Sequence, residues 1–295
     1  QYSLDRFANP ILTDAYEPAS VMKTVTMALA LNQGVLKPTD IYLNHRALTI
    51  DGLRVQNSTD RAAGAMQTFQ EAMSWSFNVG SVAMLERIGG GTLNADGRQK
   101  LFDFQRRLGF GQRTGVELQE SEGYVRPPNS GWALNHCYAN MTFGQCQSVT
   151  MIQMAAAHGA IINNGTRFRP TVIQGQGGEV VESDIITESV SREMREVLYE
   201  VANLFSTSRE EPFASRYCGG KTGTAQVPNP AGGYFNDRQI GSFFGACVPN
   251  AEVMPDLVVG VRYGGPGLLG SGTGAKRIWD DLMRDILPYS EAITY

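Results

Sequence analysis

The change from helix-forming to strand-forming sequence near residue 205 is the feature that most limits how this chain can fold. Before it, the sequence predicts helices over 20–33, 68–73, 79–88, 97–108, 149–162 and 189–204. After it, strands are predicted over 216–226, 240–248 and 256–263, followed by a last helix over 273–287. Residues 111–148 are rich in Gly, Pro, Asn and Ser and predict mostly loop. A helical middle with clustered late strands favours an α+β layer fold over alternating βαβ units.

Composition narrows the function classes. The chain has 295 residues, of which 42% are hydrophobic and 18% charged, so it can bury a substantial core. Its net charge of -4 argues against a nucleic-acid binder, which usually carries a basic stripe. Cysteines and histidines show no metal-ligand spacing. We therefore expect no metal and no cofactor.

Four cysteines leave two interpretations open. No two of the cysteines, Cys137, Cys146, Cys218 and Cys247, are spaced as a CxxC motif. The favoured interpretation is that all four are small buried apolar residues. One disulfide remains possible if the domain is exported. The first residues lack the basic start and apolar centre of a signal peptide, and no apolar run of about 18 residues occurs. Any targeting segment is therefore expected outside this sequence.

The first chemical motif is an S-x-x-K, formed by Ser20 and Lys23 on the first long predicted helix. Residues three positions apart share one helix face, so Lys23 can reach the Ser20 hydroxyl. A serine needs a neighbouring base to become a good nucleophile, and a lysine that is buried near other cations can supply one. The alternative is a helix-capping serine followed by a solvated lysine.

The second motif is an S-x-N, formed by Ser76 and Asn78 between two predicted helices. A short turn there can point both polar side chains in one direction. Ser76 can relay a proton and Asn78 can hold an amide. The alternative is an ordinary helix start, where Ser and Asn are common.

The third motif is Lys221-Thr222-Gly223-Thr224 on a predicted strand. Glycine inside a strand often marks close approach of another backbone or a ligand. A lysine and two hydroxyls beside it predict a carboxylate-binding site. A phosphate-binding loop is excluded, because GxxxxGK is absent and the lysine precedes the threonines.

The order S-x-x-K, S-x-N, K-T-G resembles the class B penicillin-binding proteins, and in particular their division-type transpeptidase domains. Residues 16–23 are similar to the family's YEPGSxxK, with Ala19 in place of the usual glycine. Residues 76–80 are similar to SxNVG, and residues 219–245 also resemble the family. One departure lies in the connector 202–207, where the family commonly has a glycine-threonine pair. This puts the conformation of the connector in doubt, but not the chemistry.

The resemblance implies the penicillin-binding protein/serine β-lactamase-like fold, an antiparallel sheet flanked by helices beside an all-helical region. It implies a peptidoglycan D,D-transpeptidase in which Ser20 is acylated, with Lys23 as general base and Ser76 passing the proton to the leaving group. Asn78 would bind the substrate amide, and Lys221, Thr222, Gly223 and Thr224 the terminal carboxylate. Backbone N–H groups of Ser20 and Thr224 would hold the oxyanion.

The same resemblance implies peptidoglycan stem peptides and β-lactams as ligands. It also implies a membrane-embedded glycan polymerase and division or elongation proteins as partners, at the outer face of the cytoplasmic membrane. Two other functions are weighed: a serine β-lactamase, which adds a water-activating group, and a non-catalytic sensor domain. A Ser-His-Asp triad using His45, His136 or His158 explains none of the three motifs. Tyr234 and Phe235 lie in a mobile loop or in a flap that borders the cleft.

Residues 1–295 are expected to be a transpeptidase domain without its N-terminal strands, accessory region and membrane anchor. Only 19 residues precede Ser20, whereas the family resemblance implies a helix and two further strands of the sheet there. The strand at 256–263 is apolar, and we expect one of its edges to lack a partner strand in this chain.

Overall fold

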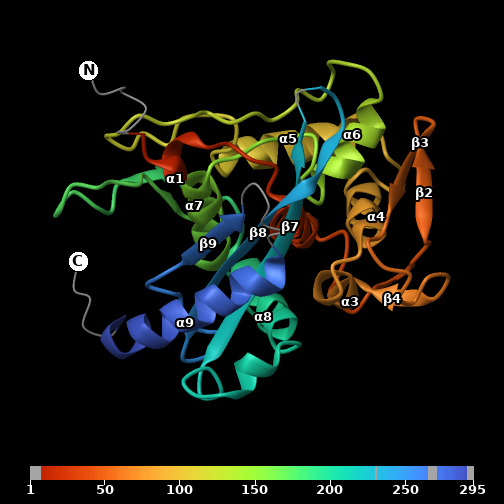
Figure 1. Cartoon of the computed structure of the whole chain (residues 1–295). Helices are drawn as coiled ribbons and strands as arrows, with labels where there is room; N and C mark the ends of the chain where they lie inside the picture. Colours follow the sequence, from red (N-terminus) through yellow and green to blue (C-terminus); the bar gives the residue numbers. More distant parts are fainter. Residues whose placement is uncertain (1–7, 230, 265–270, 291–295) are drawn as a thin grey trace.

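The structure, a computed structural model, describes residues 8–229, 231–264 and 271–290. It has two parts: a three-stranded antiparallel sheet covered by helices, and a helical part that carries small two-stranded sheets (Figure 1). The described chain is therefore α+β, as the sequence predicts.

The helices and strands have the following bounds. The α-helices are α1 (Pro10–Thr13), α2 (Lys23–Asn32), α3 (Phe69–Ser74), α4 (Asn78–Ile88), α5 (Ala95–Arg107), α6 (Leu134–Met141), α7 (Met151–Ile162), α8 (Glu188–Ala202) and α9 (Gly272–Ser290). The 3₁₀ helices are η2 (Ala19–Met22) and η3 (Ser206–Arg209). The strands are β1 (Ile41–Leu43), β2 (Ala47–Ile50), β3 (Leu53–Gln56), β4 (Met66–Thr68), β5 (Arg167–Phe168), β6 (Val180–Glu182), β7 (Tyr217–Pro228), β8 (Tyr234–Val248) and β9 (Val259–Gly264).

The main sheet has the order β7-β8-β9, with both pairs antiparallel. Successive side chains of a strand point to opposite faces, and β8 shows this in its two buried phenylalanines. Phe243 packs against Trp279 of α9, with ring centroids 5.0 Å apart. Phe244 stacks on His158 of α7 at 5.2 Å. Helices therefore cover both faces of the sheet, and Figure 1 shows α9 on one face with α7 and α8 on the other.

The helix α2 lies at the centre of the molecule. Nine of its residues, Lys23 to Leu31, are buried. A helix that is buried all round cannot be amphipathic, and this one contains only a single charged side chain, that of Lys23. The strands β2 and β3 form a hairpin beside α4 through an Asp51-Gly52 turn with positive φ at both residues (50° and 79°). Asp-Gly at these positions is typical of a type I′ hairpin turn.

Most predicted elements are confirmed, and the differences have physical reasons. The helix predicted over 20–33 begins as the 3₁₀ turn η2 and becomes α-helical at Lys23. The last helix does not end before Pro288 but continues to Ser290, so the proline lies in its final turn, where few residues follow it. The prediction of mostly loop over 111–148 missed α6, whose helical form depends on four buried residues and not on local sequence.

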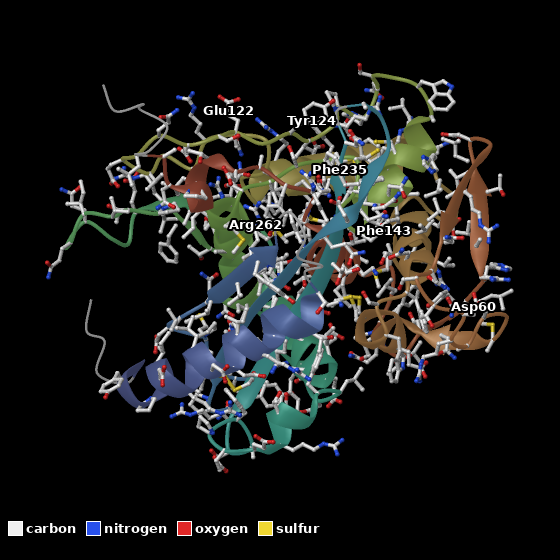
Figure 2. The ribbon with its side chains drawn as sticks, viewed as in Figure 1. Asp60, Glu122, Tyr124, Phe143, Phe235 and Arg262 are labelled. Atoms are coloured by element: carbon white, nitrogen blue, oxygen red, sulfur yellow. A yellow bond between two sulfur atoms is a disulfide. The ribbon has the colours of Figure 1, made fainter. Side chains whose placement is uncertain are left out.

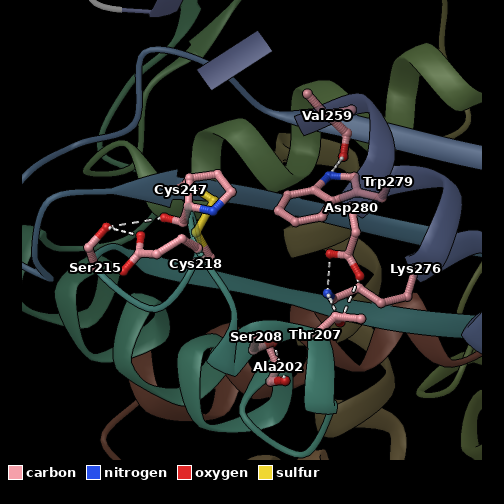
Figure 3. Close-up of a disulfide and its surroundings, with 12 residues drawn as sticks. Ala202, Thr207, Ser208, Ser215, Cys218, Cys247, Val259, Lys276, Trp279 and Asp280 are labelled. Atoms are coloured by element: carbon pink, nitrogen blue, oxygen red, sulfur yellow. Dashed lines mark hydrogen bonds and ion pairs between the residues drawn. A yellow bond between two sulfur atoms is a disulfide. The ribbon is translucent and has the colours of Figure 1, made fainter. Parts of the chain in front are cut away.

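A disulfide joins Cys218 and Cys247, which lie directly opposite each other on β7 and β8 (Figure 3). The interpretation of these two cysteines as reduced apolar residues was wrong, and the open alternative of one disulfide is confirmed. Cys137 and Cys146 are free. Nearby, the connector 202–207 leads from the end of α8 into η3, and its Thr207 donates a hydrogen bond to Asp280 at 2.8 Å (Figure 3). Asp280 also pairs with Lys276 inside α9.

The strand β9 pairs with β8, and its other edge has no partner strand within the described residues. The expected further strands therefore stay a prediction. None of the described helices combines the length and the apolar character needed to cross a bilayer.

Candidate active site

The three motifs meet in one cleft of about 520 Å³ between β7 and the helical part of the molecule. Five of the eight predicted site residues line it: Ser20, Ser76, Asn78, Thr222 and Thr224. The other predicted residues, Lys23, Lys221 and Gly223, lie buried directly behind them. The sequence prediction of one shared site is therefore consistent with the geometry of all eight residues.

Lys23 connects the first motif to the second through the hydrogen bonds of its side-chain nitrogen. Its Nζ lies 3.0 Å from Ser20 Oγ and 3.0 Å from Ser76 Oγ, and it donates to Asn78 Oδ1 at 2.8 Å and to the Ser76 carbonyl at 2.6 Å. Its side chain is 0% exposed, and no carboxylate of the described residues forms an ion pair with it. Burial, and then the nearby charge of Lys221, lowers the Lys23 pKa well below its ordinary value. A lysine whose pKa is lowered in this way loses its proton more readily and can then act as a base.

Ser76 occupies a strained turn between α3 and α4. Its φ is +59°, in the left-handed region that non-glycine residues seldom adopt. This turn points the hydroxyl at two ammonium groups, since Lys221 Nζ donates to Ser76 Oγ at 3.1 Å. The alternative of a solvated lysine in the first motif is wrong, because Lys23 is buried and bonded to both serines.

Asn78 begins α4 and has two partners. Its Oδ1 accepts from Lys23, and its Nδ2 donates to the Gln56 carbonyl of β3 at 2.9 Å. The next residue, Val79, donates its N–H to Asn57 Oδ1 at 3.0 Å. The hairpin of β2 and β3 thus holds the start of α4 in place, a relationship that the sequence prediction did not include.

The strand β7 supplies the opposite wall. Lys221 is 1% exposed, and burial lowers its pKa to about 7. Thr222 and Thr224 face the cleft, and Thr224 Oγ1 accepts from Gly272 N at 2.9 Å. A Cβ at Gly223 would lie 2.6 Å from Ser242 Oγ and 2.8 Å from the Pro18 carbonyl. Glycine at this position therefore allows β7 to approach the turn that precedes Ser20.

Ala19, where the resembling family usually has glycine, has a φ of +51°. This left-handed conformation explains why glycine suits the position. The Ala19 N–H donates to the Gly144 carbonyl at 3.2 Å, which ties the turn to the segment after α6. The substitution keeps the turn conformation at some cost in strain.

The sequence analysis missed much of the cleft wall. These residues come from β3 and the residue after it, from α6 and the segment that follows it, and from β7 and β8: Arg54, Gln56, Asn57, Asn140, Phe143, Gln145, Gln226 and Gln239. The Asp51-Gly52 pair is a hairpin signal and could have indicated the first group. Figure 2 marks Phe143 on this wall. No Asp or Glu is among the described residues that line the cleft.

The histidine alternative finds no support. His158 is buried, and its Nδ1 lies 3.2 Å from the Met154 carbonyl, away from Ser20. Burial lowers the His158 pKa to about 4. His45 is exposed, His136 contacts Asn140, and no histidine of the described chain bonds to Ser20.

Tyr234 and Phe235 are not among the residues that line the cleft. Tyr234 is tied to the body of the molecule, because its hydroxyl donates to Glu17 Oε2 at 3.0 Å. Phe235 lies on β8 (Figure 2). The guanidinium carbon of Arg238 lies over its ring, 4.0 Å from the ring centroid. Both residues belong to a strand, so the interpretation as a loop was wrong, and a role as a flap stays a prediction.

Comparisons with known proteins identify the family of this chain. The family model described as penicillin binding protein transpeptidase domain matches residues 1–284. The chain is 32% identical to Stage V sporulation protein D of Bacillus subtilis over 288 residues, covering 92% of this chain and 42% of that protein. It is 29% identical to penicillin-binding protein PbpB of Mycobacterium tuberculosis over 279 residues, covering 88% of this chain and 39% of that protein. The chain thus spans about two fifths of the length of these relatives.

Solved structures show the same fold. Penicillin binding protein 3 from Mycobacterium tuberculosis, complexed with aztreonam, matches with a TM-score of 0.75 and 26% identity, covering 96% of this chain and 67% of that chain. The apo transpeptidase domain of Burkholderia pseudomallei penicillin-binding protein 3 matches with a TM-score of 0.77, over 95% of this chain and 82% of that chain. At 23% identity, the second match bears on the fold alone.

Proposed function

This chain belongs to the penicillin-binding protein transpeptidase family, and we propose that it is a peptidoglycan D,D-transpeptidase that cross-links stem peptides through an acylated serine. The observation that carries the proposal is the hydrogen-bonded chain from Ser20 through Lys23 and Ser76 to Lys221. It joins a nucleophile, a base, a proton carrier and a carboxylate site in one cleft. Several relatives carry the name peptidoglycan D,D-transpeptidase, among them one from Caulobacter vibrioides.

In the first half of the reaction, Ser20 Oγ attacks the carbonyl of the penultimate D-alanine. Neutral Lys23 accepts the hydroxyl proton across the 3.0 Å contact. The tetrahedral oxyanion lies between the backbone N–H groups of Ser20 and Thr224, where fixed donors stabilise the developing charge. The terminal D-alanine then leaves as an amine and must gain a proton.

Ser76 supplies that proton. Its hydroxyl contacts Lys23 and Lys221, so a proton taken from Ser20 can pass through Lys23 to Ser76 and then to the leaving nitrogen. The acyl-enzyme is resolved when an amine of a second stem peptide attacks it, with the same groups acting in reverse. Asn78 holds Lys23 through its Oδ1, and its second amide hydrogen is available to a substrate carbonyl.

The carboxylate of the substrate, or of a β-lactam, binds beside β7. Lys221 provides the positive charge, and the hydroxyls of Thr222 and Thr224 provide hydrogen bonds. Gly223 keeps the strand close to Ser20, which places this anion beside the nucleophile. A β-lactam carries the same carboxylate beside a strained amide, so it acylates Ser20 and stays attached.

A hydrolytic β-lactamase is the second candidate, and the lining of the cleft argues against it. Rapid deacylation needs a group that activates water. The described residues that line the cleft include no carboxylate and no histidine. A non-catalytic sensor would not need the complete set of Ser20, Lys23, Ser76 and Lys221 in hydrogen-bond contact.

We place the domain in the cell envelope, at the outer face of the cytoplasmic membrane. The relatives named for peptidoglycan transpeptidases support this, and the Cys218–Cys247 disulfide suits an oxidising compartment. A membrane-embedded glycan polymerase and division or elongation proteins are the proposed partners. The family relationship is the observation that supports these partners.

The test is intact-mass analysis after treatment with benzylpenicillin. We expect one added drug per chain, on the peptide that contains Ser20, and none in Ser20→Ala. Labelling that survives in Ser20→Ala would overturn the assignment. Nitrocefin separates the three candidate functions. A β-lactamase hydrolyses it continuously, whereas a transpeptidase stops after one acylation. A non-catalytic sensor domain forms no covalent adduct.

A further inference from the structure

The Glu17 carboxylate joins three segments that lie far apart in the sequence. Glu17 is three residues before Ser20, just ahead of the 3₁₀ turn η2 that carries the proposed nucleophile. Its Oε1 accepts from the Cys146 N–H at 3.0 Å, and its Oε2 accepts from the Tyr234 hydroxyl at 3.0 Å. Glu17 is not among the described residues that line the cleft, and the mechanism proposed above gives it no role.

The backbone on both sides of Glu17 is held against the segment that follows α6. Tyr16 exchanges two N–H···O bonds with Val149, each 2.9 Å long, and the Ala19 N–H donates to the Gly144 carbonyl at 3.2 Å. A Cβ at Gly144 would lie 2.3 Å from the Ala19 carbonyl oxygen, so the two segments pack closely. None of these hydrogen bonds reaches β7 or β8. The position of the turn relative to the main sheet therefore depends on other contacts.

The Tyr234 hydroxyl comes from the end of the β7–β8 hairpin that carries its turn, where the pairing of the strands is irregular. Gln226 pairs with Gln239 and Pro228 pairs with Tyr234, with a register shift between the two pairs. From 239 to 234 the chain takes five steps on β8, whereas from 226 to 228 it takes two on β7. Such a bulge disrupts the ladder locally, and Pro228 has no N–H to donate. The hydrogen bond to Glu17 therefore helps to hold this end of the hairpin in place.

The turn and the hairpin that Glu17 connects also supply the two proposed oxyanion donors. One donor is the backbone N–H of Ser20 in η2, and the other is the N–H of Thr224 on β7. A Cβ at Gly223 would lie 2.8 Å from the Pro18 carbonyl, so β7 passes close to the turn. Oxyanion donors stabilise the developing charge only when they are held in place before the reaction. A change in the spacing of the turn and β7 would therefore weaken this stabilisation.

We propose that Glu17 is a positioning residue for the acylation of Ser20: its carboxylate connects the turn before Ser20 to the β7–β8 hairpin through Tyr234, and so sets the spacing of the two oxyanion donors. Glu17 contacts no reacting atom and acts through the groups that it holds. The inference rests on the proposed function, because it concerns the rate of the same acylation. Loss of Glu17 should slow the chemical step more than it weakens binding of the drug, whose carboxylate is bound on β7 alone.

The first experiment measures acylation by benzylpenicillin over a range of drug concentrations, which gives the limiting rate constant and the apparent dissociation constant separately. We expect Glu17→Ala to lower the limiting rate roughly tenfold, with little change in the dissociation constant. Tyr234→Phe removes only the hydroxyl and should lower the limiting rate roughly fivefold. The control is Tyr289→Phe on α9, whose side chain is 70% exposed. A wild-type limiting rate in Glu17→Ala or in Tyr234→Phe would overturn the proposal.

A purely structural role for Glu17 would change other quantities. The melting temperature and the final stoichiometry of bound drug report on the folded fraction, whereas the limiting rate constant describes each folded molecule. Glu17→Gln should recover part of the limiting rate, because its amide oxygen can accept one of the two hydrogen bonds. A lower stoichiometry in Glu17→Ala with a wild-type limiting rate would mean that Glu17 only supports folding. If Glu17→Ala does not fold, Glu17→Gln and Tyr234→Phe still decide the question.

The second experiment combines the two substitutions. Because Glu17 acts through Tyr234, the double variant should be acylated no more slowly than Glu17→Ala alone. Losses that multiply would show that the two side chains act independently, and would overturn the proposed connection. A wild-type chain that forms no adduct with benzylpenicillin would overturn the proposed function itself. A wild-type chain that is acylated at the same limiting rate as Glu17→Ala would overturn this inference alone.

Discussion

The side-chain nitrogens of Lys23 and Lys221 both contact the hydroxyl oxygen of Ser76, at 3.0 Å and 3.1 Å. Both lysines are buried, and neither has a carboxylate partner among the described residues. Two like charges so close together disfavour double protonation. One lysine is therefore expected to be neutral when the cleft is empty, which is what a general base at Lys23 requires.

This arrangement predicts the pH dependence of acylation. The rate constant for acylation should rise with pH as Lys23 loses its proton, to a plateau well below the ~10.4 of free lysine. Drug binding should weaken above the Lys221 pKa of about 7, because the carboxylate prefers the cation. Acylation efficiency measured by stopped flow should therefore follow a bell-shaped curve. Lys221→Arg should move the alkaline decline upward, and an unchanged rate in Lys23→Ala would contradict the assignment of the base.

The same lysine should make stability depend on pH. The Lys221 pKa is about 7 in the folded state and ~10.4 unfolded, so the unfolded state binds more protons between these values. The free energy of unfolding should then rise with pH, by about 1.4 kcal/mol per pH unit for this group. Urea titrations at pH 7 to 9 should show a smaller slope in Lys221→Met. The exposed control Lys37→Met should keep the wild-type slope, and equal slopes in all three proteins would contradict the shift.

Much of the site could be predicted from the sequence, because each motif carries its own chemistry and the three occur in a characteristic order. The helix pattern placed Ser20 one turn from Lys23, which the structure confirms at 3.0 Å. Long helices such as α7 and α8 were also predicted to within a few residues. In these segments local propensity and burial favour the same structure.

The features of the fold and of the site that were not predicted depend on contacts between residues far apart in the sequence. The Cys218–Cys247 bond requires the register of β7 against β8, which no local pattern reveals. The helix α6 forms in a loop-like sequence because tertiary packing covers it. The Asn57 contact with Val79 joins two segments whose sequences give no sign of each other.

Ala19 offers a test of backbone strain next to Ser20, the proposed nucleophile. Its φ of +51° is costly for alanine but not for glycine. Ala19→Gly should therefore raise the free energy of unfolding by about 0.5–1 kcal/mol. The matched control is Ala28→Gly in the buried middle of α2, which should lower it by about 1 kcal/mol or more. Urea denaturation that shows equal losses for both variants would mean that the turn at Ala19 carries no strain.

Gly223 should tolerate no side chain. A Cβ there would lie 2.6 Å from Ser242 Oγ and 2.8 Å from the Pro18 carbonyl, so β7 would have to move away from the turn before Ser20. We expect Gly223→Ala to lower the acylation rate at least roughly tenfold. Gly177→Ala is the control, because nothing lies within 4 Å of its added Cβ and its φ is not positive. A wild-type acylation rate in Gly223→Ala would show that the strand has room to move.

Asn57 should act as a positioning residue for the second motif. It is 8% exposed and accepts from Val79 N at 3.0 Å, while its Nδ2 donates to Asn44 Oδ1 at 2.9 Å and to the His45 carbonyl at 3.2 Å. Asn57→Leu keeps the approximate volume but leaves the Val79 N–H and the Asn44 oxygen without these partners. The free energy of unfolding should fall by about 1–3 kcal/mol.

Because Val79 follows Asn78, and Asn78 holds Lys23 at 2.8 Å, Asn57→Leu should also change how acylation depends on pH. A loosened Asn78 stabilises the Lys23 cation less, so the acid limb of the rate profile should shift to lower pH, while the maximal rate falls as Ser76 loses its alignment. The neighbouring Gln56→Ala is the control, because Gln56 holds Asn78 through its backbone carbonyl, which the substitution keeps. A loss of stability in Asn57→Leu with an unmoved pH profile would reduce Asn57 to a structural role and leave Asn78 positioned by Gln56 alone.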